Sequence, residues 1–142
     1  MTRRLFTSLC VLATVLASAA GGGDPRIAVI VHRERRDTLD VRDVAAIYLR
    51  KRRFWEDGAP IIALNREAGN PLREAFSRKV LGTTSAQLSG YWNEQYFHGI
   101  LPPATLSSSE STKRFVAQEP NAVGYVELEI ADASVRVAIV LD

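Results

Sequence analysis

Apolar and polar positions follow one another along this chain in blocks that predict strands and helices in turn. Residues 26–32 form an almost unbroken run of Ile, Ala and Val, which is typical of a strand covered on both faces. Residues 41–49 then place apolar side chains three and four positions apart, which predicts a helix with Asp40 as its N-cap and Asp43 in its first turn. A short buried strand is expected at Ile61–Leu64.

The next block, residues 65–82, predicts a polar turn that leads into a second helix. Asn70 suits the helix N-cap, and Pro71 suits the first helical position, where a missing N–H costs nothing. Gly82 follows the last periodic residue as a C-cap. The apolar face of this helix is expected to consist of Leu72, Ala75, Phe76 and Val80.

The remaining residues predict two helices followed by two strands. Residues 84–87 have a capping-box pattern before a helix, and Pro102 and Pro103 indicate a loop after it. Ser107–Ser109 are candidate caps of a further helix that reaches Glu119. Strands are expected at 122–126 and 134–141. Because few residues separate these two strands, we expect them to pair antiparallel, next to an otherwise mostly parallel α/β sheet flanked by helices.

Several aromatic side chains could either line a ligand groove or pack in the core. Their helical spacing favours core packing. The residues concerned are Trp55, Tyr91, Trp92, Tyr96 and Phe97.

The first residues of the 142-residue chain predict export. Arg3 and Arg4 precede an apolar run that ends in Ala-Ser-Ala, which is typical of a cleavable signal peptide at 1–19 followed by a flexible lead-in at 20–25. The folded domain is then expected at 26–142. Cleavage removes Cys10 and two of the 18 basic residues, which leaves 16 basic against 16 acidic residues and no thiol. The predicted mature protein is therefore a near-neutral periplasmic domain that relies on its core for stability.

The sequence pattern does not indicate a metal site, a catalytic site or a nucleic-acid interface. The only two histidines, His32 and His98, lie far apart, and no cluster of carboxylates is seen, so we expect no metal and no cofactor. No base is placed near the serines, so we expect no catalytic residues and no enzyme. A near-neutral chain without a recognition motif also argues against nucleic acid as a partner.

The polar turn before Pro71 is the best candidate for a binding site. A strand, a glycine-containing turn and a helix N-terminus together favour an anion. The candidate ligands are Arg66, Gly69, Asn70 and Arg73. An ordinary capped loop remains the alternative. Arg66 discriminates between the two, because a cation near a helix N-terminus does not help the helix.

A basic cluster ends the first predicted helix and is the candidate contact for a partner. It consists of Arg50, Lys51, Arg52 and Arg53. Cations at a helix C-terminus complement its dipole and stay solvated, which is the simpler interpretation. Contact with an acidic partner or with anionic lipid is the alternative.

Five pieces of the chain, in order, resemble the phosphate-specific periplasmic binding proteins of ABC transporters. They are the strand Ile27–Val31, the helix Leu39–Leu49, the tryptophan turn Phe54–Ile61, the anion loop Asn65–Phe76 and the strand Pro120–Val126. Two departures are visible. Asn70, Pro71 and Leu72 stand where that family has serine, glycine and threonine, and much of the family's second lobe is missing.

The resemblance implies one lobe of a type 2 periplasmic-binding-protein-like fold and an exported protein that binds phosphate or a similar oxyanion. The alternative is an interaction or sensor-accessory module that kept the fold and lost the ligand. A membrane transporter or sensor protein is the expected partner, and a homodimer could rebuild the cleft between two lobes.

Overall fold

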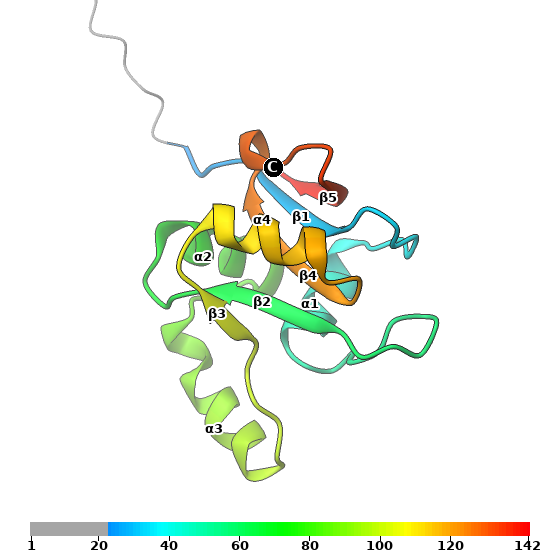
Figure 1. Ribbon diagram of the computed structural model, residues 1–142. Helices are drawn as coiled ribbons and strands as arrows, with labels where there is room; N and C mark the ends of the chain where they lie inside the picture. Colours follow the sequence, from blue (N-terminus) through cyan, green and yellow to red (C-terminus); the bar gives the residue numbers. More distant parts are fainter. Residues whose placement is uncertain (1–22) are drawn as a thin grey trace, which may run out of the picture.

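The computed structural model describes residues 23–142, in which the strands form one five-stranded sheet in the order β3-β2-β4-β1-β5 (Figure 1). The strands are β1 (Ile27–His32), β2 (Ile62–Arg66), β3 (Ala104–Leu106), β4 (Ala122–Glu127) and β5 (Val135–Leu141). The short strand β3 was not predicted. The predicted signal peptide and the start of the lead-in lie outside the described residues. Among the described residues, no helix has the length and apolar character needed to span a bilayer.

The sheet is mixed, and helices flank it, so the predicted α/β class is confirmed. Strand β2 is parallel to both β3 and β4, whereas β1 is antiparallel to β4 and to β5. The prediction that the last two strands pair with each other is wrong, because β1 lies between them. β4 and β5 therefore run in the same direction.

The connection between β4 and β5 explains this arrangement. β4 ends beside Ile27 and β5 begins beside His32, so residues 128–134 travel back along the whole of β1. Seven residues can span up to about 23 Å, and a six-residue strand is roughly 20 Å long, so this connection spans β1 without a crossover α-helix. The connection contains the 3₁₀ turn η3 (Leu128–Ile130). Lys113 anchors it to the neighbouring helix through Asp132 at 2.8 Å.

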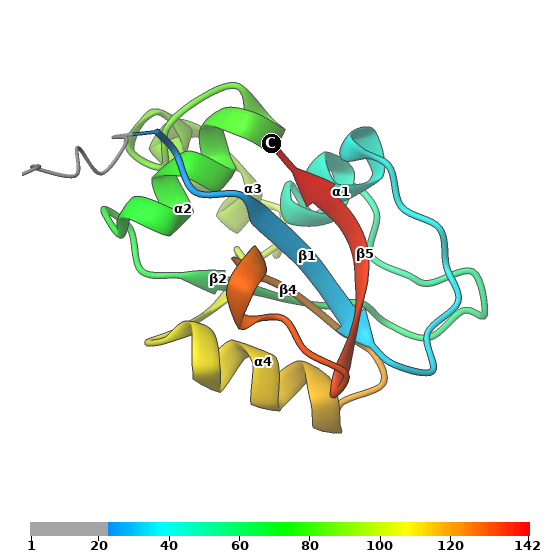
Figure 2. The same ribbon diagram turned by 90° about the horizontal axis from the view of Figure 1, so that it is seen from above.

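Helices cover the two faces of the sheet (Figure 2). One face carries α1 (Val41–Tyr48) and α2 (Pro71–Phe76), which continues as the π-helical segment η1 (Ser77–Leu81), and the other carries α4 (Ser109–Gln118). The predicted caps form, because Asp40 makes a capping box with Asp43 and Ser108 makes one with Ser111. β1 is buried throughout, as its unbroken apolar run predicts.

An aromatic cluster fills the core between β2, β4 and the helices α1 and α2. Phe76 stacks on Tyr125 with ring centroids 3.9 Å apart, and Tyr48 meets Phe76 edge-on at 4.7 Å. The Tyr48 hydroxyl donates to the Leu64 carbonyl at 2.7 Å, which satisfies its one buried polar group. These contacts join α1 to the middle of β2 and the end of α2 to β4.

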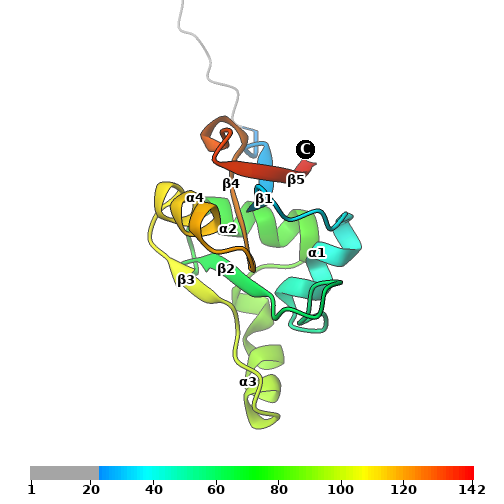
Figure 3. The same cartoon turned by 45° about the vertical axis from the view of Figure 1, so that its right-hand side comes forward.

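Helix α3 (Ser89–Phe97) follows the 3₁₀ turn η2 (Ala86–Leu88) and extends away from the sheet (Figure 3). Core packing of its aromatic face was expected and is wrong, since none of its residues is buried and Tyr96 and Phe97 are 66% and 86% exposed. Other helices already cover the two sheet faces, so the aromatic residues of α3 are at most half-buried, although the Tyr91 hydroxyl donates to the Leu49 carbonyl at 2.6 Å. The same expectation is confirmed for Trp55, which is 2% exposed.

Candidate functional site

The turn between β2 and α2 has the local structure that its sequence predicts. Asn70 is the N-cap of α2, and its side-chain oxygen accepts from the N–H groups of Leu72 at 3.0 Å and Arg73 at 3.4 Å. Gly69 precedes it with φ at +83°, a conformation that a side chain would strain. Pro71 takes the first helical position. This geometry places the Gly69 N–H at the edge of a hollow.

That hollow has a volume of about 580 Å³ and lies between the turn and the start of η2. Its lining consists of Ala68, Gly69, Glu74, Ser85, Ala86 and Ser89. The Glu74 carboxylate accepts the Gly69 N–H at 3.2 Å, the Ser85 N–H at 3.3 Å and the Ser85 hydroxyl. Three donors from two separate segments thus converge on one pair of carboxylate oxygens. The hydrogen bond from the Ser85 hydroxyl is the largest cause that lowers the pKa of Glu74.

Sequence reasoning missed Glu74 and Ser85. Eleven positions separate them, and no local pattern links a helix side chain to a residue of the following turn. A weak signal was present, because a carboxylate in the first turn of a helix suits the helix dipole.

Arg66 lies at the end of β2 and is 8% exposed. Its guanidinium donates to the carbonyls of Leu106 and Ser107, each at 3.1 Å, and to the Ser109 hydroxyl at 2.9 Å. These bonds join β2 to the connection between β3 and α4. The Ser109 hydroxyl in turn donates to Glu127 at 2.6 Å, so the cation lies close to a carboxylate. Contact between Arg66 and an anion stays a prediction.

Arg73 reaches back across the turn. Its Nη1 donates to the Arg66 carbonyl at 2.8 Å, while its Nε is buried and has no hydrogen-bond partner within residues 23–142. A buried donor without a partner costs free energy, so an acceptor at this place would stabilise the protein. The structure therefore brings Gly69, Asn70 and Arg73 together at the turn, and Arg66 joins them through its main chain.

The predicted basic cluster does not act as one unit. Arg52 pairs with Asp43 at 3.5 Å and donates to the Phe54 carbonyl, while Lys51 is exposed. Arg50 and Arg53 instead line a groove on the other side of α1's end. Contact between this cluster and a partner stays a prediction.

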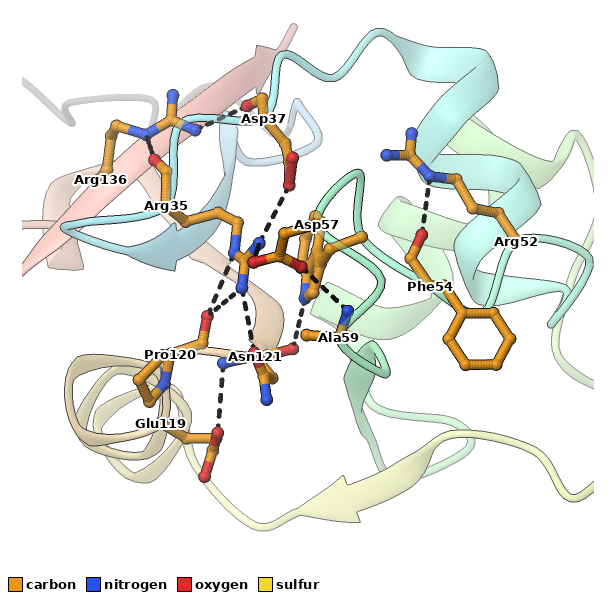
Figure 4. Close-up of polar contacts among 11 residues, drawn as sticks. Arg35, Asp37, Arg52, Phe54, Asp57, Ala59, Glu119, Pro120, Asn121 and Arg136 are labelled. Atoms are coloured by element: carbon orange, nitrogen blue, oxygen red, sulfur yellow. Dashed lines mark hydrogen bonds and ion pairs between the residues drawn. The ribbon is translucent and has the colours of Figure 1, made fainter.

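A second polar network surrounds Arg35, in a segment that sequence reasoning treated only as a charged loop (Figure 4). The Arg35 guanidinium pairs with Asp37 at 3.3 Å and Asp57 at 3.2 Å, and it also donates to the Pro120 carbonyl and the Asn121 side chain. It stacks 4.6 Å from the centre of the Trp55 ring. All three of its nitrogens have partners, so this network fixes the tryptophan turn against the start of β4 and leaves no cation for a ligand.

Metal binding has no visible basis in the part of the chain that the structure describes. Within residues 23–142, no three His, Cys, Asp or Glu side chains are grouped so that they could hold an ion.

Solved structures with a similar fold include proteins of phosphate ABC transport. A protein from Clostridium perfringens, assigned to the phosphate ABC transporter substrate-binding proteins and solved with bound phosphate, has 26% sequence identity and a TM-score of 0.65 over 80% of this chain. An ABC-type phosphate transport receptor from Vibrio cholerae has 18% identity and a TM-score of 0.63 over 80%. PstS from Borrelia burgdorferi has 16% identity and a TM-score of 0.60 over 83%.

The match covers only part of these proteins. This chain spans 44%, 46% and 47% of their respective lengths, and they are binding proteins rather than enzymes. At the level of sequence, neither a family model nor a curated protein matches the chain. By its fold, the chain is therefore similar to part of the phosphate-specific substrate-binding proteins of ABC transporters.

Proposed function

We propose that this protein is a non-enzymatic component that binds phosphate or a similar oxyanion weakly in the hollow at the β2–α2 turn. One observation carries the proposal, namely that the Gly69 N–H, the Ser85 N–H and the Ser85 hydroxyl converge on a carboxylate. Carboxylates and phosphates accept hydrogen bonds in the same way, so donors arranged around one also suit the other. The phosphate-bound structure from Clostridium perfringens, which has a similar fold, supports the choice of ligand.

The predicted site residues have distinct roles in this proposal. Asn70 uses its side-chain oxygen as the helix cap, which leaves its amide N–H groups to donate to the anion. Arg73 does not line the hollow, but its guanidinium adds positive charge at the start of α2, and its buried Nε lacks a partner among the described residues. Arg66 holds the end of β2 through its bonds to the β3–α4 connection and adds positive charge nearby.

Glu74 makes the binding weak. Its carboxylate already occupies the donors of Gly69 and Ser85, and its lowered pKa keeps it negatively charged at neutral pH. An incoming phosphate must displace this side chain and overcome repulsion from its charge. Binding in the millimolar range is therefore expected for the wild-type protein.

Calorimetric titration with inorganic phosphate tests the proposal. Glu74→Gln keeps the shape of the side chain but removes its charge, and it is expected to tighten binding about tenfold, which corresponds to about 1.4 kcal/mol. Arg66→Ala is expected to weaken the response, because it removes positive charge near the turn and the hydrogen bonds that hold the end of β2. Glu129→Gln, a change of the same charge at an exposed position, is the matched control and should leave the affinity unchanged. No heat at millimolar phosphate from either wild type or Glu74→Gln would rule the proposal out.

A second candidate function is an interaction or sensor-accessory module that has lost the ligand. It is favoured by the same hydrogen bonds, because Asn70 and Glu74 together satisfy the N–H groups of Gly69, Leu72 and Arg73 from within the chain. The Glu74→Gln titration separates the two candidates. If removing this charge gains no phosphate binding, the donors serve the fold and the second candidate stands.

The proposal includes export to the periplasm by the predicted signal peptide. It also includes a membrane transporter or sensor protein as the partner. Fractionation of cells that express the full chain tests the location. Light scattering over a range of protein concentrations, with and without phosphate, tests whether two copies pair to complete a cleft.

A further inference from the structure

A groove lies at the opposite end of β2 from the oxyanion hollow. It has a volume of about 420 Å³ and runs between the end of α1, the starts of β2 and β3, and the loop that follows α3. Its lining is Arg50, Arg53, Ile61, Ile62, Ala63, Gly99, Ile100, Leu101, Pro102, Pro103 and Ala104. Two arginines thus stand among apolar walls, and the lining contains no acidic residue.

Arg50 is poorly satisfied in this groove. Its Nε is buried without a hydrogen-bond partner among residues 23–142, and its Nη1 makes only a long contact of 3.4 Å to the Ile61 carbonyl. Neither Arg50 nor Arg53 forms an ion pair within the described part of the chain. Burial, followed by the charge of Arg53, lowers the pKa of the Arg50 guanidinium. An anionic group in the groove would give the Arg50 guanidinium a hydrogen-bond acceptor and a countercharge.

The backbone at Arg50 gives an independent reason to look for a role. Arg50 follows the C-cap of α1 with φ at +61°, and it is the only residue other than glycine with a positive φ in the described chain. The helix ends in a Schellman motif, in which Lys51 N–H bonds to the Ala46 carbonyl at 2.8 Å. Glycine is the usual residue at this position because a side chain is disfavoured there. Ending the helix therefore does not explain an arginine.

Complementing the helix dipole does not explain it either. Lys51 and Arg52 already place positive charge at the end of α1 and remain in contact with solvent or with Asp43. Arg50 differs from them because its guanidinium lies partly buried between apolar walls. That environment suits a carboxylate whose neighbours are themselves apolar.

We propose that this groove binds an acidic peptide segment of a partner protein, with a carboxylate on Arg50 and Arg53 and flanking apolar side chains against Ile100 and Leu101. Leu101 is 62% exposed, so the apolar wall is open to such a segment. A concave, mostly apolar groove favours a peptide over a membrane surface, which would require a broad basic face. The groove is separate from the oxyanion hollow, and the proposal does not depend on phosphate binding.

Selection from a random nine-residue peptide library on the immobilised protein tests this proposal. Enriched peptides are expected to carry an acidic residue between apolar residues, and a synthetic peptide of the consensus sequence should bind in a fluorescence anisotropy titration. Arg50→Gly should weaken that binding at least tenfold while raising the melting temperature by roughly 2–5 °C, because it relieves the backbone. Arg53→Gln should weaken binding several-fold. Arg42→Gln, at an exposed position of α1, is the matched control and should not change it.

Three results would overturn the proposal. One is enrichment of peptides without acidic residues, and a second is binding of the consensus peptide by Arg50→Gly with unchanged affinity. The third is binding to vesicles of phosphatidylserine and phosphatidylcholine that depends on Arg50 in the absence of any peptide preference. A gain in melting temperature without any loss of peptide binding would show that Arg50 has no role in the groove.

Discussion

At the scale of single residues, the candidate site depends on side chains whose partners are distant in the sequence. Asn70 caps its own helix, as the local pattern predicts. Glu74, in contrast, accepts hydrogen bonds from Ser85, which lies eleven positions further along the chain. Arg66 likewise donates to residues some forty positions away. A cation before a helix was interpreted as the mark of an anion site, and the structure adds internal carbonyls as partners of that cation.

Glu74 gives a pH dependence whose sign follows from its pKa. Hydrogen bonds, first that from the Ser85 hydroxyl, lower this pKa below its ordinary value of 4.5 in the folded state. The charged form therefore stabilises the folded protein at neutral pH, and this stabilisation is lost as the pH falls through the lowered folded value. Denaturant unfolding of wild type and Glu74→Gln should show a constant difference in free energy down to about pH 5.

Below that pH the two proteins should approach one another as the pH falls through the lowered pKa of Glu74 in the folded state. The two proteins differ only at this side chain, so the difference in free energy of unfolding isolates Glu74. A difference that persists unchanged at pH 3 would contradict the role of its charge.

At the scale of elements, close packing decides which residues a position accepts. Gly124 of β4 lies under α4, and a Cβ added there would come within 2.6 Å of the Thr112 Cγ2 atom. Helix α3 shows the opposite case, since its aromatic side chains recur at helical spacing but none of them is fully buried. Periodicity alone therefore identifies a helix without showing what covers it.

Gly124→Ala is expected to lower the free energy of unfolding by about 1–3 kcal/mol, because the added methyl group forces α4 away from the sheet. Thr112→Ser removes the clashing methyl group and keeps the hydroxyl that donates to the Ser108 carbonyl at 2.9 Å. The double variant should regain most of the loss in urea denaturation. Gly90→Ala, in the open helix α3, is the control and should not destabilise the protein. Equal effects at both glycines would contradict the packing argument.

At the scale of the whole molecule, β1 is a fully buried inner strand that links β5 to the rest of the sheet. It pairs antiparallel with β4 on one side and β5 on the other, and its side chains enter both layers of the core. β5 reaches its place only because residues 128–134 cross the sheet on the face that α4 covers. The last residues of the chain therefore complete the core that the first strand begins.

A chain that ends at Ala131 lacks β5 and is expected to lose cooperative unfolding, because the fully buried strand β1 would become an exposed edge. Circular dichroism during urea denaturation measures this loss. A chain that ends at Leu141 is the matched control, since it loses only Asp142 and its exposed ion pair with Arg26, and its stability should change by less than about 0.5 kcal/mol. A sharp transition in the shorter chain would show that β5 is dispensable.

The sequence by itself determined the local elements of this protein. The run at 26–32 specified a strand buried on both faces, and the caps at Asp40, Asn70 and Ser108 specified where three helices begin. These features follow from neighbouring residues, whose spacing and hydrogen-bonding groups act over one turn of helix or one face of a strand. The α/β class and the place of the β2–α2 turn follow from the same local patterns.

Only the tertiary structure decided how these elements meet. It placed β1 between β4 and β5, left the aromatic face of α3 exposed, and brought Glu74 to Ser85 beside Gly69. It also separated Arg50 and Arg53 from the rest of their basic cluster. Each of these outcomes depends on contacts between segments far apart in the chain, and the energy of such contacts leaves no periodic pattern in the sequence.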